Sequence, residues 1–254
     1  MSQLIDLDTV KEFMAETLDR VAHKYLIQMA DDMEVKSAYF QKVLQEEYLP
    51  HATEEEILVL LNLIFSIKRK SKEIINTLGL MPFKEAVREL LYGRKMIEIR
   101  FQTFCTKVKL KDKYMRADLA SELLHFNMPD KYWLWTRWMW NPKLKTGALP
   151  LVVTEDFDLK GDNLGEIYMK VGRAVAFVHS MSEVGGYRFI SDRLFGTNVF
   201  LSCVYVIYAY TVLKMRMTKE FNNVMPGVVE FSRRILGLYR ISEKNLLSEV
   251  VEDQ

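Results

Sequence analysis

The chain has 254 residues, of which 49% are hydrophobic and 27% charged, and its formal net charge is +1. This composition supplies ample material for a core, and it excludes a strongly basic overall footprint of the kind that nucleic-acid-binding domains carry. Two cysteines, Cys105 and Cys203, lie inside apolar runs without metal-motif spacing, so we expect reduced, buried thiols. The N-terminal segment MSQLIDLDTVKEF is acidic and amphipathic and has no apolar signal-peptide region, so we expect a cytoplasmic location.

Apolar positions recur at helical spacing over most of the chain, which predicts an all-α fold of eight or nine helices. In chain order we expect helices at 8–33, 35–48, 54–78, 82–108, in both halves of 115–140, and at 165–181, 199–217 and 226–238. Ser242 is expected to cap a final short segment. Residues 143–164 predict a long irregular loop with a candidate short strand at 149–153, and residues 182–198 a second irregular segment.

Three local signals set boundaries within this pattern. Thr53 and Glu56 form a capping-box pattern at the start of a helix. Gly79 is expected to end that helix, and Gly93 is a weak point inside the next one. We expect an N-terminal helical subdomain over 1–114 and a C-terminal one over 115–254, joined in one compact unit.

The longest strongly apolar run, Val199–Leu213, is shorter than the roughly twenty residues that a membrane-spanning helix needs. We therefore expect a buried core helix there, and we do not expect a membrane partner.

All four tryptophans lie in the segment 115–140, and its second half, if helical, has two different faces. Arg137 shares one face with Trp133 and Trp140, and these three residues are our candidate surface for a protein partner or a second copy of the chain. The opposite face is wholly apolar and is expected to be buried: Leu134, Trp135, Trp138 and Met139. The alternative is that all four rings belong to the core and that Arg137 only extends along them.

Residues 123–138, LLHFNMPDKYWLWTRW, resemble a helix–turn–helix join found in some helical-barrel modules related to the helix–hairpin–helix DNA glycosylases. The glycine-rich hairpin and the catalytic lysine–aspartate arrangement of that family are not seen in this sequence. The resemblance therefore assigns no family and carries no catalytic residue.

Glu122 and His125 form a Glu-x-x-His pair on one helical face, a spacing that di-iron bundles use in two copies. The other histidines have no acid three residues earlier, so the pair is a weak metal candidate and we expect no metal. A hydrogen-bonded structural histidine is the alternative.

Two other groups of basic residues are candidate anion sites. Arg188 and Arg193 follow Gly185-Gly186 and match an anion-binding turn, although a loop that caps the next helix has the same composition. A basic run beside the aromatic segment is a candidate nucleic-acid surface or, alternatively, a solvated linker: Lys107, Lys109, Lys111, Lys113 and Arg116.

The sequence contains no nucleophile elbow, phosphate loop, dinucleotide fingerprint or zinc signature, so we assign no catalytic residue and expect no cofactor. The leading hypothesis is a non-catalytic cytoplasmic interaction or assembly protein that uses the Trp133/Arg137/Trp140 face. The alternatives are a nucleic-acid-associated protein, and an enzyme or small-anion-binding protein that uses Glu122, His125, Arg188 and Arg193.

Overall fold

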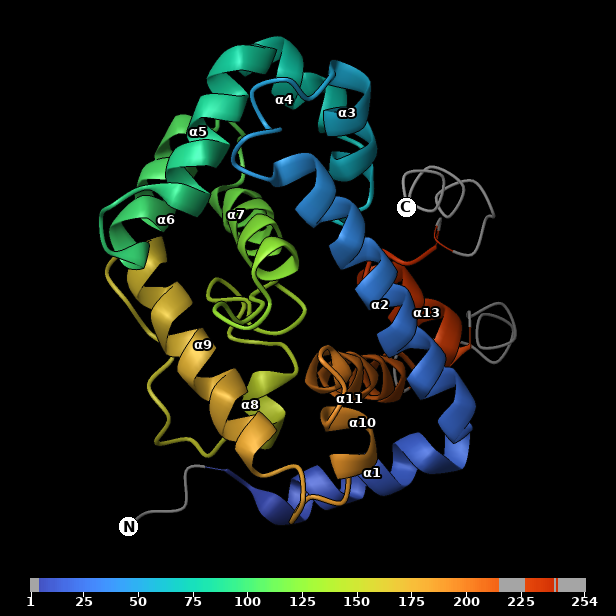
Figure 1. Ribbon diagram of the computed structural model, residues 1–254. Helices are drawn as coiled ribbons and strands as arrows, with labels where there is room; N and C mark the ends of the chain where they lie inside the picture. The colour runs from blue at the N-terminus through green and yellow to red at the C-terminus, as the bar shows by residue number, and fades with distance from the viewer. Residues whose placement is uncertain (1–4, 215–226, 240, 242–254) are drawn as a thin grey trace.

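The computed structural model describes residues 5–214, 227–239 and 241, and these form twelve helices joined by turns and loops (Figure 1). In chain order the helices are α1 (Leu7–Arg20), α2 (His23–Leu44), α3 (Glu54–Asn62), α4 (Ser71–Leu78), α5 (Leu80–Tyr92), α6 (Ile97–Lys107), α7 (Lys113–Asn127), α8 (Leu149–Val152), α9 (Leu164–Ser180), α10 (Arg188–Ser191), α11 (Gly196–Lys214) and α13 (Val228–Ile235). The all-α class is confirmed, whereas the expected number of eight or nine helices is wrong, because several expected helices are divided.

The first division falls between α1 and α2. Val21 is buried and extended, with φ −131° and ψ 113°, so the helix expected over 8–33 ends at Arg20. The next helix begins at His23 and continues through the break expected near residue 34. Ala22 is non-helical as well, with φ −60° and ψ 141°, so two consecutive residues interrupt the helical hydrogen-bond ladder.

The helices expected over 54–78 and 82–108 are also divided, into α3 and α4 and into α5 and α6. Gly93 ends α5 rather than weakening a continuous helix. The last carbonyl groups of α5 then find a partner in α6, because the Arg100 guanidinium donates to the carbonyl oxygens of Leu90 and Leu91. The side chain thus replaces the hydrogen bonds that a continuing helix would supply.

The other two local signals are confirmed. The Thr53 hydroxyl accepts a hydrogen bond from the Glu56 amide at 3.2 Å, and the Glu56 carboxylate accepts one from the Thr53 amide at 2.6 Å. Gly79 ends α4 with φ 87°, a conformation that favours glycine. The short strand expected at 149–153 is wrong, because residues 149–152 form α8 and only Val153 makes an isolated bridge, to Ile5.

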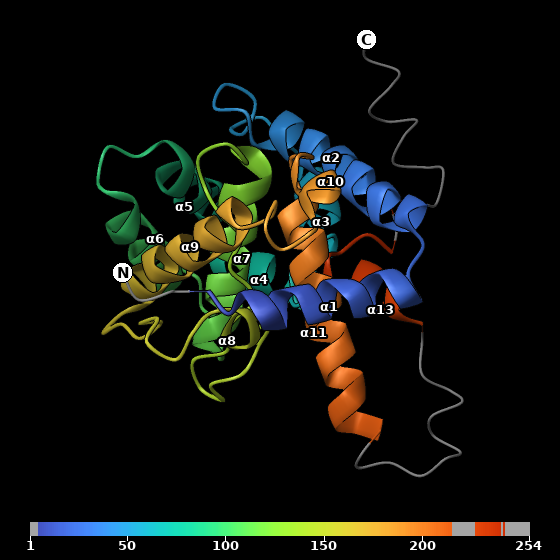
Figure 2. The same cartoon turned by 90° about the horizontal axis from the view of Figure 1, so that it is seen from below.

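Two central helices organise the packing (Figures 1 and 2). Helix α7 is buried on all sides, with ten consecutive buried residues from Ala117 to Phe126, and it contacts α2, α5, α6 and α9. Helix α11 contains the apolar run that predicted a core helix, and it packs against α1, α2, α9, α10 and α13. The expected end of that helix, at 215–217, and the segment from Ser242 lie outside the described residues.

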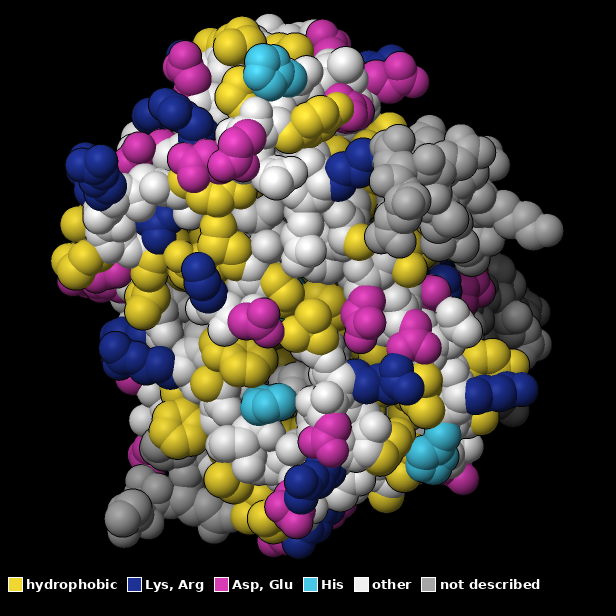
Figure 3. Space-filling model, in the orientation of Figure 1, with side chains coloured by type: hydrophobic (Ala, Val, Ile, Leu, Met, Phe, Trp, Pro, Cys, Tyr) yellow, Lys and Arg dark blue, Asp and Glu magenta, His cyan; other side chains and the backbone are white. Residues whose placement is uncertain are grey.

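Positive and negative side chains are interspersed on the molecular face in Figure 3. Several described ion pairs on the surface join neighbouring turns of the chain, as between Arg20 and Glu16 or between Arg234 and Glu230. Such exposed pairs contribute little to stability.

Candidate ligand-binding site

The tryptophan-bearing segment is not a helix, which corrects the expectation that half of 115–140 would form one. Helix α7 ends at Asn127, and the backbone from Met128 to Trp140 is irregular, with one turn after α7 and another at the end of the segment, where the Trp140 amide donates to the Thr136 carbonyl at 3.0 Å. The helix–turn–helix join suggested by the resemblance of residues 123–138 is therefore not present.

Side chains of α7 explain why this segment is irregular. The Trp135 amide donates to the Ser121 hydroxyl at 2.6 Å, and the Arg137 amide donates to the Asp118 carboxylate at 2.9 Å. Ser121 and Asp118 are three residues apart on α7, so they present acceptors on the same side of the helix. The amides that a helix would pair internally are instead bound by a neighbouring element.

The four indoles have different surroundings. Trp135, Trp138 and Trp140 are buried, with 1%, 7% and 7% exposure, whereas Trp133 is half-buried with its ring 5.4 Å from that of His179. Burial of Trp135 and Trp138 was expected, although from a helix that does not exist. Burial of Trp140 agrees with the alternative in which its ring belongs to the core, and not with its assignment to a partner-binding face.

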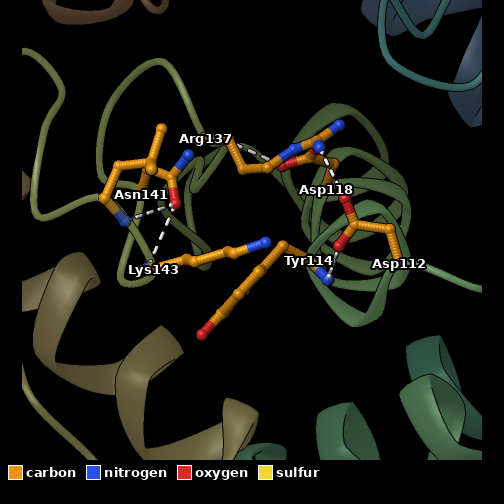
Figure 4. A network of polar contacts seen from close by, with 7 residues as sticks. Asp112, Tyr114, Asp118, Arg137, Asn141 and Lys143 are labelled. Carbon is orange, nitrogen blue, oxygen red and sulfur yellow. Dashed lines mark hydrogen bonds and ion pairs between the residues drawn. The ribbon is translucent and has the colours of Figure 1, made fainter.

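Arg137 is held by carboxylates (Figure 4). Its Nε donates to Asp118 at 2.9 Å, and its other guanidinium nitrogen, Nη1, donates to Asp112 at 2.8 Å. Burial raises the pKa of Asp118, and the charge of Arg137 opposes that rise. The expected arrangement, with Arg137 between Trp133 and Trp140 on one exposed helix face, is therefore wrong.

A concave site of about 480 Å³, which we call the basic pocket, lies where the N-terminal end of α7 meets the loops before α9. Its wall contains four basic residues and a single acidic one, Asp162, together with Trp140. The basic residues are Lys113, Arg116, Lys145 and Lys160. None of these four forms an ion pair within the described part of the chain.

The basic residues of the pocket come from separate elements. Arg116 is fixed by donating to the carbonyl oxygens of Leu110 at 2.7 Å and Cys105 at 3.2 Å, so its charge stays unneutralised while its position is set. Lys145 lies in the turn that the 141–146 bridge closes, and Lys160 in the loop before α9. Asn163, which caps α9, also lines the pocket, so the positive end of a 17-residue helix lies at its edge.

The structure divides the basic run that the sequence singled out. Lys113 and Arg116 line the basic pocket, whereas Lys107, Lys109 and Lys111 are exposed and lie outside its wall. Sequence reasoning missed Lys145 and Lys160, because their place beside α7 depends on loop paths with no local signature. The nearness of basic and aromatic residues in the chain was a partial signal, since Trp140 does join the wall.

Glu122 and His125 each have a different partner in the core. The Glu122 carboxylate accepts a hydrogen bond from Lys36 Nζ at 2.7 Å, and burial raises the pKa of Glu122 to about 7. His125 donates from Nδ1 to the Tyr132 carbonyl at 2.7 Å, and burial lowers its pKa to about 4. No group of three or more potential metal-ligating His, Cys, Asp or Glu side chains occurs among the described residues.

Arg188 and Arg193 do not converge with Glu122 on one site. Arg188 is exposed and pairs with Glu183 at 3.0 Å and Asp192 at 3.5 Å, and Arg193 pairs with Asp31 of α2. Both arginines already face carboxylates, so anion binding by this loop stays a prediction that the ion pairs do not favour.

Comparison with protein-family models, with curated protein sequences and with solved structures finds no match. Across the described ranges, none of the helices combines the length and the apolar character needed to cross a membrane.

Proposed function

We propose that this protein binds a small phosphate-bearing ligand, of about the size of a nucleotide, in the basic pocket. The single observation that carries the proposal is the set of four basic side chains without ion-pair partners among the described residues, facing one acidic residue across a cavity of about 480 Å³. A cleft lined by charge of one sign raises the local concentration of ligands of the opposite sign. Small-ligand pockets commonly range from about 300 to 1,000 Å³, so the volume suits this class.

The chemistry of the wall favours phosphate over a simple halide. Arg116 offers planar N–H donors whose position two carbonyl oxygens fix, and Lys113, Lys145 and Lys160 add point charges. Trp140 is 7% exposed and its indole nitrogen, Nε1, has no acceptor within the described residues. An apolar ring on the ligand would find the indole as a contact surface, because aromatic rings and bases stack favourably.

The test compares AMP with adenosine, which lacks only the phosphate, by isothermal titration calorimetry. AMP should bind with an affinity at least about tenfold higher, and the affinity should fall as salt is raised, because the phosphate supplies the charge that the lysines contact. Equal affinities for the two compounds would contradict the proposal.

A matched pair of variants separates the pocket from general surface charge. Lys145→Gln/Lys160→Gln removes two exposed lysines from the wall, and Lys107→Gln/Lys109→Gln removes two exposed lysines outside it. We expect the first variant to weaken AMP binding by about tenfold or more and the second by less than about threefold. Equal losses would show that net charge, and not the pocket, decides binding.

The same pair of variants addresses the nucleic-acid alternative. A single-stranded oligonucleotide that binds more tightly than AMP, and loses most affinity in the Lys107/Lys109 variant, would assign the exposed lysines before α7 to nucleic acid. Protein binding through Trp133, Arg137 and Trp140 also stays a prediction. It has less support, because Trp140 is buried and Arg137 is paired with Asp112 and Asp118.

A further inference from the structure

A second cavity, which we call the aromatic pocket, has a volume of about 310 Å³ and lies beside the middle of α7. Four aromatic residues line it: Phe65 after α3, Trp138, Tyr205 of α11 and Phe231 of α13. Two carboxylates of α7, Asp118 and Glu122, belong to the same wall. The basic pocket shares none of these residues.

The charges that face the aromatic pocket are not balanced. Arg137 is the single basic residue in its wall, and its guanidinium already bonds both Asp112 and Asp118. These three groups together carry one negative charge. Lys36, the partner of Glu122, does not line the pocket, and its side chain is 0% exposed. A ligand in the pocket would therefore contact the carboxylates of Asp118 and Glu122. Lys36 lies outside the wall, and Arg137 is shared between two acids.

Glu122 retains the capacity for a further hydrogen bond. Lys36 Nζ contacts its Oε2 at 2.7 Å, and its other carboxylate oxygen, Oε1, has no partner in the described chain. A buried carboxylate normally fills the acceptor sites of both oxygens. The open oxygen belongs to a residue of the pocket wall, so a donor on a ligand would complete its hydrogen bonding.

Unpaired polar atoms of other wall residues are an independent sign of a ligand. Thr136 and Trp138 are 4% and 7% exposed, and neither the Thr136 hydroxyl nor the Trp138 indole nitrogen has a partner within the described residues. Buried polar groups are rarely left without a partner. The Thr136 hydroxyl oxygen can accept a hydrogen bond from an ammonium group, whereas the Trp138 indole N–H is itself a donor and only its ring face can attract a cation.

We propose that the aromatic pocket binds an organic cation, namely a protonated amine carried on a small apolar body. The amine would donate to the open oxygen of Glu122, and the rings of Trp138, Tyr205 and Phe231 would surround the apolar part and face the charge. The Phe65 ring already has Lys68 Nζ 5.0 Å from its centroid, so it adds only apolar contact. An anionic ligand is disfavoured, because it would face two carboxylates at close range. This inference does not depend on phosphate binding in the basic pocket, because the two walls are different.

The experiment uses three probes of one shape: 2-phenylethylamine, which is protonated at neutral pH, its neutral analogue 2-phenylethanol and the anion 3-phenylpropionate. Binding to the full chain is followed by calorimetry and by tryptophan fluorescence. We expect the amine to bind at least about tenfold more tightly than the alcohol, because the neutral alcohol makes neither the charge interaction with Glu122 nor the cation–π contact. We expect the acid to bind most weakly. Equal binding of amine and alcohol, or no binding of the amine, would overturn the proposal.

Three variants locate the site. Glu122→Gln removes the charge, Trp138→Phe replaces the indole by a ring with weaker cation–π attraction, and Lys145→Gln, in the basic pocket, is the control. We expect the first two to weaken amine binding by about fivefold or more and the control to leave it within about twofold. If Glu122→Gln does not fold, Trp138→Phe decides the question. Amine affinity that Trp138→Phe leaves unchanged, or that Lys145→Gln lowers equally, would place the amine elsewhere.

Discussion

The carboxylate of Asp118 binds Arg137 twice, through the backbone amide at 2.9 Å and through the side-chain Nε at 2.9 Å. One buried acid on α7 thus fixes both the path of the tryptophan-bearing backbone and the direction of its arginine. The segment is held by a side chain from another element, and not by its own helical hydrogen bonds.

Asp118→Asn should destabilise the protein by about 2 kcal/mol, because the buried carboxylate that pairs with Arg137 is replaced by a neutral amide. The loss stays moderate because Arg137 is 29% exposed and water can still hydrate its guanidinium. Asp112→Asn is the matched control. Asp112 is 42% exposed, and asparagine still caps α7, so its loss should stay below about 1 kcal/mol. Urea unfolding of both variants gives the comparison, and equal losses would contradict the role assigned to Asp118.

Removing one partner of the buried ion pair between Lys36 and Glu122 should lower the free energy of unfolding much more than replacing both partners by apolar residues. Lys36→Met leaves the Glu122 carboxyl buried without its cation, and we expect a loss of about 3–5 kcal/mol. In Lys36→Met/Glu122→Leu both charges are gone, and most of that loss should be recovered. A double-mutant cycle in urea measures the coupling. A double variant no more stable than Lys36→Met would show that the two charges do not stabilise each other.

His125 should make the protein acid-sensitive. Its pKa falls from 6.5 to about 4 on folding, so the unfolded chain binds a proton more readily and stability is lost as the pH falls from 6.5 through 4. Protonation of His125 alone should lower the free energy of unfolding by on the order of 3 kcal/mol over this pH range. The raised pKa of Glu122 acts in the opposite sense, since its contribution is present at low pH and is lost as the pH rises from 4.5 through about 7.

The variant His125→Asn isolates the histidine term. Asparagine can still donate to the Tyr132 carbonyl but does not titrate. The unfolding free energy of the variant should therefore fall less between pH 6.5 and 4 than that of the unaltered protein. Urea midpoints across this pH range measure the difference. Parallel pH profiles for the two proteins would contradict the buried, neutral state assigned to His125.

Two glycines of α9 should respond oppositely to alanine. At Gly165 a Cβ would lie 2.1 Å from the carbonyl oxygen of Glu98, where α6 and α9 pack closely, so Gly165→Ala should cost about 1–3 kcal/mol. At Gly172 the nearest atoms, of Trp133, lie at 3.9 Å, so Gly172→Ala should stabilise the helix by about 0.5–1 kcal/mol. Thermal melts of the two variants that shift in the same direction would contradict this description of the α6–α9 contact.

Features encoded within a few residues could be predicted from the sequence. The capping box at Thr53 and the helix end at Gly79 need only neighbouring atoms, and the apolar run of α11 needs only its own composition. The division at Val21 could not be predicted, because it depends on what that side chain packs against.

The path of the tryptophan segment could not be predicted for a related reason. A helical projection assumes that each amide pairs with a carbonyl four residues earlier, whereas Ser121 and Asp118 supply the acceptors in this segment. The same long-range contacts decide the site. Lys113 and Arg116 were singled out, but Lys145 and Lys160 become their neighbours only through the loops of the fold.

The irregular stretch after Thr136 supplies side chains to both pockets, with Trp138 and Leu144 in the aromatic one and Trp140 and Lys145 in the basic one. Two binding sites built on one backbone are joined by thermodynamic linkage. By whatever factor occupancy of one cavity alters affinity in the other, the reverse effect must have the same size and sign.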